Sequence, residues 1–201
     1  MASAIPELVE QLRSVDFNAR ALALAALVRR GKAATPALVE ALRSPDDGLR
    51  MQAAQGLAEI ADPACAETFA DALRDSNKQV RARAAQGLAR IKDGRALDAL
   101  VQTIDDFPDV LHSPFTLSAY ELIDIGPIAL PAVAPLLRSA DPMTRAHAFV
   151  VVRSIVSQLP EAGDWDQLWR SLGCYEPFGA DPQRDRAADQ WLTWIRQRTP
   201  M

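Results

Sequence analysis

Two stretches of the chain share nearly the same order of small, apolar and charged residues. Gly48 to Leu73 reads "GLRMQAAQGLAEIADPACAETFADAL", and Gln79 to Ile104 reads "QVRARAAQGLARIKDGRALDALVQTI". Both contain Ala-Ala-Gln-Gly-Leu-Ala, so Leu57 and Leu88 lie 31 positions apart. Apolar residues in each stretch recur at i and i+4, which is one face of an α-helix. The pattern predicts a pair of helices that the chain repeats.

The repeat has a period near 30 residues along most of the chain. The first apolar position of its shorter helix is occupied in turn by Leu8, Leu38, Phe69, Leu100 and Val133. The position four residues on is occupied by Leu12, Leu42, Leu73, Ile104 and Leu137. With no strand-like alternation, this predicts an all-α fold, a right-handed α-α superhelix of about five helix pairs within residues 1–158.

Small residues are unusually frequent in the longer helix of each pair. A helix inside a stack is covered on two faces, and alanine together with Gly56 and Gly87 allows close approach of neighbouring backbones. Leucine at each turn supplies the apolar volume. We therefore expect the repeats to share one continuous core, because so short a unit cannot bury its apolar stripe alone.

A polar residue precedes an arginine by four positions at the start of each longer helix except one. The pairs are Asp16–Arg20, Asp46–Arg50, Asn77–Arg81 and Asp141–Arg145. The side-chain oxygen predicts an N-cap, and the arginine one turn later can bridge to an acid of its own or the next repeat. We interpret these residues as a structural ladder; an arginine row that binds a ligand is the alternative.

The repeated helix pair, with a polar residue four positions before an arginine, resembles the HEAT repeat. It most resembles the short repeats named for phycobilisome lyases. The clearest copies are 46–73 and 75–104. The resemblance implies a helical solenoid with a curved surface that binds another molecule. Proteins with such repeats include scaffolds, bilin-lyase subunits, a family of DNA glycosylases and a metal-dependent hydroxylase of deoxyhypusine, so it does not by itself select one function.

The fourth repeat departs from the pattern, since Leu111 stands where the arginine is expected. Ser113-Pro114 predicts a helix start, with the serine as cap and proline in the first turn. The segment before it contains unusual side chains for this chain: Phe107, His112 and, just beyond, Phe115. Irregular loops on a regular scaffold are common sites of function, although a tolerated insertion explains the segment equally simply.

The short helices carry a second row of charges. Glu10, Glu40, Asp71 and Gln102 share one position, and arginine stands three residues after each of the first three. The resemblance implies that these helices line the concave face, where the acids could bind basic residues of a partner protein. Alternatively they form helix-surface ion pairs, each worth about 0.2–0.5 kcal/mol.

All four tryptophans lie after the repeats, at Trp165, Trp169, Trp191 and Trp194. Asp181-Pro182 predicts the start of a final helix over residues 182–198. Residues 159–201 are therefore predicted to form a helical cap on the last repeat, as the ends of solenoids require. An exposed docking anchor is the alternative, because tryptophan is frequent at binding hot spots.

Composition and candidate chemistry narrow the functional classes. The net charge of −4 and the pI near 5.2 disfavour binding to nucleic acid or to an anionic membrane. The two histidines, His112 and His147, lack the repeated His-Glu pairs of the hydroxylase branch, and Cys65 and Cys174 lack zinc-site spacing. No catalytic, metal or cofactor motif is recognisable, and neither a secretory signal nor a long apolar run is seen.

The sequence thus predicts a cytoplasmic, non-enzymatic protein-binding module without a cofactor. A subunit that handles a bilin chromophore is the alternative, and a nucleic-acid-binding module is the third hypothesis. The sequence does not determine the oligomeric state, although a monomer is favoured.

Overall fold

The computed structural model describes residues 4–109 and 114–198. They form two compact units, Met1–Ala99 and Leu100–Met201, which are described separately below. Most of the described residues are helical. The only β-type pairing among them is an isolated bridge between Pro108 and Thr116. The predicted all-α class is confirmed.

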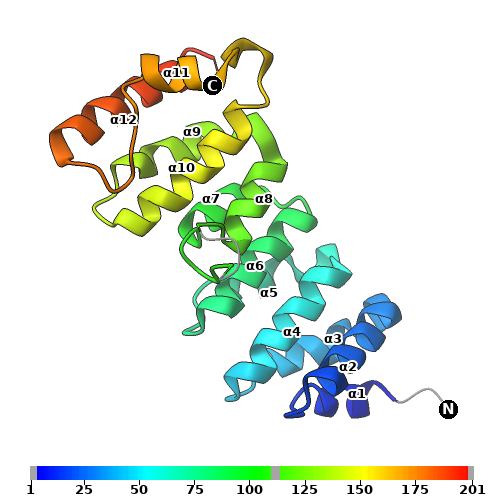
Figure 1. Cartoon of the computed structure of the whole chain (residues 1–201). Coiled ribbons are helices and arrows are strands. Elements are labelled where there is room, and N and C mark those ends of the chain that lie inside the picture. Colours follow the sequence, from blue (N-terminus) through cyan, green and yellow to red (C-terminus); the bar gives the residue numbers. More distant parts are fainter. Residues whose placement is uncertain (1–3, 110–113, 199–201) are drawn as a thin grey trace. The chain divides into compact units, whose positions relative to one another are not determined.

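Long and short helices alternate in the first unit (Figure 1). The long ones are α2 (Phe17–Arg30), α4 (Asp47–Ile60) and α6 (Lys78–Arg90). The short ones are α1 (Ile5–Gln11), α3 (Thr35–Ala41), α5 (Ala66–Ala72) and the beginning of α7 (Ala96–Gln102), with the 3-10 turns η1 (Gly31–Ala33) and η2 (Pro63–Cys65) between them. Helix α4 packs between α2 and α6, and α1, α3 and α5 each pack on the long helix of their own repeat.

The long helices begin where the sequence places a cap. Asp16 accepts a hydrogen bond from the amide of Asn18, and Asp46 accepts from the amides of Gly48 and Leu49. Asn77 and, in the second unit, Asp141 accept from the amide two residues on. Each side chain satisfies a backbone donor that has no partner within the first turn of the helix.

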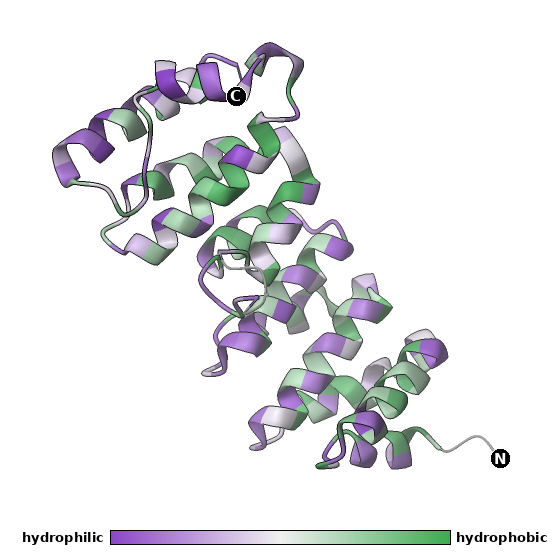
Figure 2. Ribbon diagram, viewed as in Figure 1, coloured by the Kyte–Doolittle hydropathy of each residue, from purple (hydrophilic) through white to green (hydrophobic). Residues whose placement is uncertain are grey.

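The core of the first unit consists of the repeating leucines and small residues. Leu27, Leu57 and Leu88 are fully buried, as are Leu38 and Phe69 of the short helices. Figure 2 shows hydrophobic and hydrophilic positions alternating along these helices. A β-carbon on Gly87 would lie 2.4 Å from the ring of Phe69, and one on Gly56 would lie 3.1 Å from Leu24 and Leu38. The two glycines therefore do permit close packing of α5 on α6 and of α3 on α4.

The second unit contains the irregular repeats and the tail. Its helices are α8 (Leu117–Ile125), η3 (Gly126–Ala129), α9 (Leu130–Val133), η4 (Ala134–Arg138), α10 (Pro142–Val156), η5 (Pro160–Ala162), α11 (Trp165–Ser171) and α12 (Asp181–Arg196). Helix α10 packs on α8, α9 and η4. Pro131 and Pro135 explain why the fifth short helix is divided into a single α turn and a 3-10 segment, since proline removes a backbone donor from the ladder.

One predicted helix start is wrong by about one turn, and a second differs by a single residue. Helix α8 begins at Leu117, because Thr116 is its cap and accepts a hydrogen bond from the amide of Ala119. Pro114 lies in the preceding turn, and Ser113 lies outside the described residues. Helix α12 begins at Asp181 after Ala180, and the Asp181 carboxylate binds Arg184 instead of capping the helix.

One described helical run is long and apolar enough, by length and composition, to cross a membrane. It covers Leu117–Arg138, with a mean hydropathy of 1.4, and the sequence analysis did not anticipate it. The core helices of many soluble proteins satisfy this criterion as well. Gly126 and Pro127, the first two residues of η3, interrupt the run after α8, and Leu122, Leu130 and Leu137 are fully buried. These three leucines belong to the core of the second unit, whereas Ile128 in the same run is exposed.

Candidate functional site

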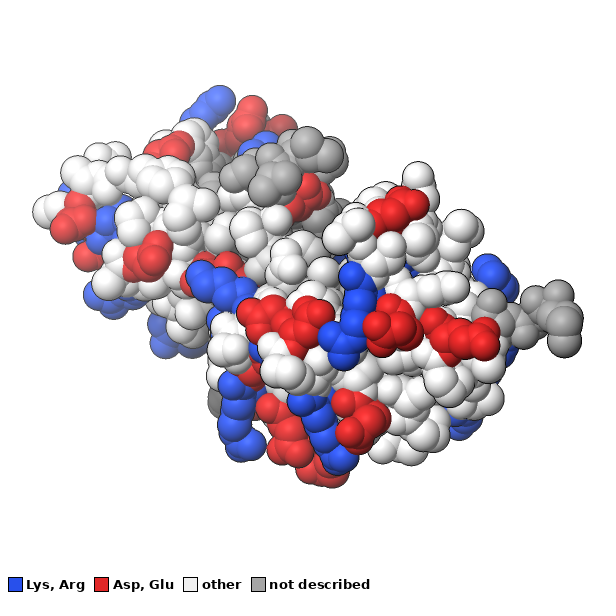
Figure 3. Space-filling view, turned by 90° about the horizontal axis from the view of Figure 1, so that it is seen from below, with Lys and Arg blue, Asp and Glu red and all other residues white. Residues whose placement is uncertain are grey.

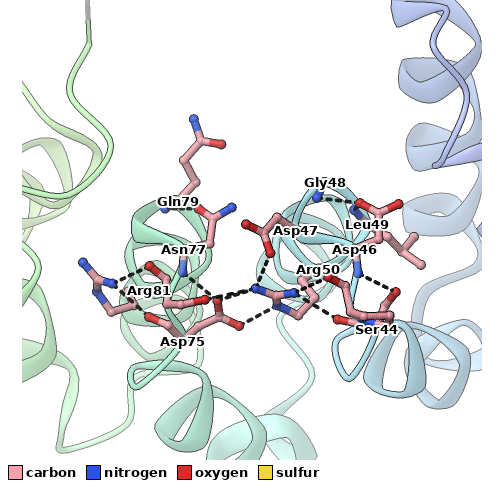
Figure 4. Close-up of polar contacts among 12 residues, drawn as sticks. Ser44, Asp46, Asp47, Gly48, Leu49, Arg50, Asp75, Asn77, Gln79 and Arg81 are labelled. Atoms are coloured by element: carbon pink, nitrogen blue, oxygen red, sulfur yellow. Dashed lines mark hydrogen bonds and ion pairs between the residues drawn. The ribbon is translucent and has the colours of Figure 1, made fainter.

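The ladder arginines bind backbone carbonyls of the loop that precedes their own helix (Figure 4). The Arg50 guanidinium donates to the carbonyls of Ser44 at 3.0 Å and Pro45 at 3.3 Å. The same arrangement, five and six residues back, recurs for Arg20 with Ser14 and Val15, for Arg81 with Asp75 and Ser76, and for Arg145 with Ser139 and Ala140. Each arginine therefore fixes the turn between a short helix and the next long one.

The predicted bridge to a neighbouring acid holds for Arg50 and takes a different form at Arg145. Arg50 binds both carboxylate oxygens of Asp75 in the next repeat, at 2.8 and 3.0 Å. Arg145 donates instead from Nε to the carbonyl oxygen of Pro177 at 2.7 Å. The acid that binds Arg50 is not the cap Asn77 but the residue two before it, which also accepts from the Asn77 amide. Arg50 thus binds an acid of the next repeat that is not itself a helix cap.

The electrostatics of the Arg50–Asp75 contact favour the charged forms. Burial by itself raises the pKa of Asp75, but the hydrogen bonds from Arg50 and from the Asn77 amide, with the charges of Arg50 and Arg81, lower it below its ordinary value. The same contact raises the pKa of Arg50. Both side chains are mostly buried, with 11% of the Arg50 and 13% of the Asp75 side chain exposed. Little of this pair is accessible to a ligand.

The row of charges on the short helices is exposed and internally paired. Arginine lies within ion-pair distance three residues after each acid: Glu10–Arg13 at 3.3 Å, Glu40–Arg43 at 3.2 Å and Asp71–Arg74 at 3.6 Å. The carboxylate side chains are 76%, 75% and 83% exposed. Figure 3, a view of one face of the protein, shows acidic and basic side chains interleaved without a large patch of one sign. The surface is therefore a row of paired charges, and pairs so exposed are weak enough to exchange partners.

A groove of about 290 Å³ lies beside this row, between α3 and α5. Val39, Leu42 and Ala72 are its apolar lining. Its charged and polar lining consists of Arg43, Thr68, Asp71, Arg74 and Asp75. The groove combines an apolar floor with charges of both signs on exposed side chains, which suits an extended polypeptide better than a small apolar ligand.

The predicted site residues of the fourth repeat lie in the second unit. Gln102 is exposed at the end of α7, and His112 lies outside the described residues. Phe107 has a positive φ of 54°, and its carbonyl accepts from the Leu117 amide. Phe115 stacks on Tyr120 with ring centroids 5.0 Å apart. The two phenylalanines are partly buried and take part in closing this loop, so they provide only limited surface for a partner.

Sequence analysis missed one polar cluster in the second unit. The Asp105 carboxylate lies 2.7 Å from Nδ1 of the buried His147 and 2.6 Å from the Thr144 hydroxyl, which donates to it. These contacts tie the turn after α7 to the start of α10. The sequence did hint at this cluster, because Asp105 is an acid where the earlier repeats have Arg13, Arg43 and Arg74. His147 therefore has a structural role, as the partner of Asp105.

The tryptophans of the tail are arranged around α10. Trp191 is fully buried and Trp194 is 7% exposed, whereas Trp165 and Trp169 are half-buried. Trp165 stacks on Trp191 at 5.5 Å, and Phe149 of α10 contacts both rings and that of Tyr175. Helix α12 packs on α9 and η4 and so covers the short-helix side of the fifth repeat.

Tyr175 anchors the loop between α11 and α12. It is fully buried, and its hydroxyl donates to the Leu137 carbonyl at 2.6 Å. Burial raises the pKa of Tyr175 to about 12. The indole of Trp169 donates to the Tyr175 carbonyl at 3.2 Å, and Arg145 holds Pro177 two residues on. Most of the conspicuous side chains of this loop therefore have structural partners.

Comparison with known proteins places this architecture in a family. The model of HEAT repeats matches residues 5–75 and 35–113, which together cover more than half of the chain. The protein belongs to the HEAT-repeat family. None of the curated proteins compared with this HEAT-repeat chain matches it. Among the described residues, no group of three or more His, Cys, Asp and Glu side chains is placed to hold a metal ion.

Solved structures similar to this HEAT-repeat chain are helical-repeat proteins at low identity. The CpcE–CpcF complex of phycocyanin lyase from Nostoc sp. PCC7120 is 22% identical over 93% of this chain and 97% of the other, with a TM-score of 0.44. An archaeal HEAT-like repeats protein from Thermococcus onnurineus NA1 is 17% identical over 99% and 83%, with a TM-score of 0.45. A designed armadillo repeat protein in complex with the peptide (KR)4 is 18% identical over 94% and 100%, with a TM-score of 0.45.

Proposed function

We propose that this HEAT-repeat chain is a non-enzymatic protein-binding module that holds an extended segment of a partner protein against α1, α3 and α5. The observation that carries the proposal is the groove between α3 and α5, in which an apolar floor adjoins exposed charges of both signs. The fold is of the type used by protein-binding scaffolds.

The charge arrangement indicates what the partner segment contains. Basic side chains of the partner can pair with Glu10, Glu40 and Asp71, provided that they replace or share the arginine three residues on. The exchange costs little, because each existing pair is solvent-exposed and screened by salt. An apolar side chain between the basic ones would then contact Val39 and Leu42 on the floor of the groove. We therefore expect a segment in which basic and apolar residues alternate.

The test is capture of partner proteins by a charge-reversed variant. The tagged wild type is used for affinity purification with mass spectrometry, in parallel with a variant carrying Glu10→Lys, Glu40→Lys and Asp71→Lys. Loss of the wild-type partners is expected. The matched control carries Glu59→Lys, Asp124→Lys and Glu161→Lys, three exposed acids outside this row. Circular dichroism and the melting temperature of both variants establish that they fold.

Three outcomes would contradict the proposal. If the variant with Glu10→Lys, Glu40→Lys and Asp71→Lys recovered the same partners, binding would not use this surface. If the control variant lost the partners equally, the effect would come from the net charge alone. Visible absorbance retained after mixing with a bilin, and abolished by neither variant, would instead favour the chromophore-handling alternative that the resemblance implies.

A further inference from the structure

The outer face of α2 is the most apolar exposed helix face of the first unit. Phe17 and Leu22 are each 71% exposed, and Val15 in the turn before the helix is fully exposed. Phe17, Asn18, Ala21, Leu22, Ala25 and Arg29 form one continuous exposed arc of the helix. Figure 1 shows α2 at the end of its unit, with α4 on its other side. We call these six residues the α2 face.

The equivalent positions of the inner repeats show how unusual this face is. Where α2 has Leu22 and Ala25, α4 has Gln52 and Gln55, and these are partly buried beside α2. At the same positions α6 has Arg83 and Gln86, beside α4. The inner helices thus carry polar residues in a covered position, whereas α2 carries apolar residues in an open one. An exposed apolar helix face of this kind marks a surface that binds another molecule.

We propose that the α2 face binds the α2 face of a second copy of this chain, in an antiparallel two-fold pair. Under that symmetry, Leu22 of each copy lies opposite Ala25 of the other, and Asn18 lies opposite Arg29. Asp16, the cap of α2, lies just before this face with an exposed carboxylate, and Arg29 lies near its other end. Antiparallel pairing brings each Arg29 toward the partner's Asp16, so these side-chain charges are self-complementary.

A parallel pair would not have this property, because it would place Arg29 beside Arg29 and Asp16 beside Asp16. The small side chains of Ala21 and Ala25 allow the two helices to approach closely, and Phe17 and Leu22 then supply the apolar contact. One helix face from each copy gives an interface at the small end of the usual range, so we expect a dissociation constant in the micromolar range. This differs from the monomer favoured by the sequence.

Sedimentation equilibrium of the full chain over a concentration series tests the proposal. The wild type is expected to convert from monomer to dimer, and Leu22→Glu is expected to weaken the dimer by roughly tenfold or more, since it buries a charge against an alanine. Ile128→Glu is the matched control, because Ile128 is 76% exposed in the second unit. It should leave the dissociation constant unchanged.

The register is tested by exchanging charges. Arg29→Glu alone should weaken the dimer, and adding Asn18→Lys should restore it, because the two positions face each other only in the antiparallel pair. A wild type that stays monomeric at the highest soluble concentration would overturn the proposal. So would a dimer that Leu22→Glu does not weaken, or an Arg29→Glu effect that Asn18→Lys does not reverse. None of these outcomes depends on the partner-binding groove.

Discussion

The second repeat and the end of the second unit use equivalent arginines, Arg50 and Arg145, for different purposes. Arg50 fixes its own turn and binds Asp75 in the next repeat, so one repeat is stabilised by contact with another of the same kind. Arg145 fixes its own turn in the same way, but its Nε donates to the carbonyl of Pro177 in the tail. At the end of the array no further repeat follows, and a non-repeated loop replaces its contribution.

The two regions also differ in how they exclude water. Between α5 and α6 the space is closed by the absence of a side chain at Gly87, against which the Phe69 ring packs. At the end of the second unit, large rings close it, because Phe149 of α10 contacts the rings of both Tyr175 and Trp191. In the inner repeats, small residues let the helices pack closely. At the end of the second unit, large aromatic rings fill the space between the helices. The predictions below test this difference.

The largest expected effect is at Arg145. Replacing it with methionine in Arg145→Met keeps much of the apolar volume but removes charged donors from the carbonyls of Ser139, Ala140 and Pro177. We expect a loss of about 3 kcal/mol in the free energy of unfolding, because charge-assisted hydrogen bonds are worth about 1.5–3 kcal/mol each and partial rehydration offsets part of the loss. Urea denaturation measures it.

Arg20→Met is the matched control for this prediction. Arg20 makes the same two turn contacts but is more exposed and has no hydrogen bond corresponding to that of Arg145 with Pro177 among the described residues. Its loss should be about 1 kcal/mol. Equal losses in the two variants would show that the Pro177 contact contributes nothing.

The second effect is at Gly87. A β-carbon there would lie 2.4 Å from the fully buried Phe69, so Gly87→Ala should cost about 2 kcal/mol by overpacking, even after the gain in helix propensity. At Gly56 the nearest atoms are flexible leucine methyls at 3.1 Å, and Gly56→Ala should be close to neutral. In a Phe69→Leu background the cost of Gly87→Ala should fall, which a double-mutant cycle measures. An unchanged cost would assign it to the backbone instead.

Much of the first unit could be predicted from the sequence because its repeats are nearly identical. The caps Asp16, Asp46 and Asn77, the leucine positions and the two glycines all follow from local rules of helix geometry. The targets of the arginines could not be predicted in this way. Each of them donates to carbonyls, and the position of a carbonyl depends on the path of the turn and not on residue type.

The second unit was less predictable for a related reason. Its contacts join residues far apart in the chain, such as Asp105 with His147 and Tyr175 with the Leu137 carbonyl, and no periodicity marks them. The handedness of the predicted superhelix, the boundary at residue 158 and the partner-binding residues stay predictions. For the candidate groove, the sequence indicated the row Glu10, Glu40 and Asp71 and its arginines, but not the apolar floor beside it.

The third effect concerns Tyr175. Tyr175→Phe leaves the buried Leu137 carbonyl without its hydroxyl donor, and we expect a loss of about 1 kcal/mol at neutral pH. Because the folded pKa is raised to about 12 from an unfolded value of about 10, the wild type keeps this contribution below pH 10 and loses it as the pH rises toward 12. Melting temperatures of both proteins across this range should therefore converge with rising pH. A constant difference would contradict the assignment.

The smallest effect is at Asp75, and it separates charge from hydrogen bonding in the inner repeat. Asp75→Asn keeps an oxygen that can accept from the Asn77 amide but removes the charge that faces Arg50, whereas Asp75→Ala removes both. For Asp75→Asn we expect a loss of below about 1 kcal/mol at neutral pH, because the amide oxygen can still accept a hydrogen bond and Arg50 keeps its bonds to the carbonyls of Ser44 and Pro45. The alanine variant should lose more.

The pH dependence of the Asp75 contribution has the opposite sign to that of Tyr175. The folded pKa of Asp75 is lowered, so its contribution is present above the unfolded value of about 3.9 and is lost as the pH falls through the folded pKa. Wild type and Asp75→Asn should therefore differ by a constant amount between neutral pH and about pH 5, and converge in stronger acid. If the difference persists in acid, Asp75 acts as a hydrogen-bond acceptor only. The inner repeat would then be held, like the terminal one, by arginine on backbone carbonyls.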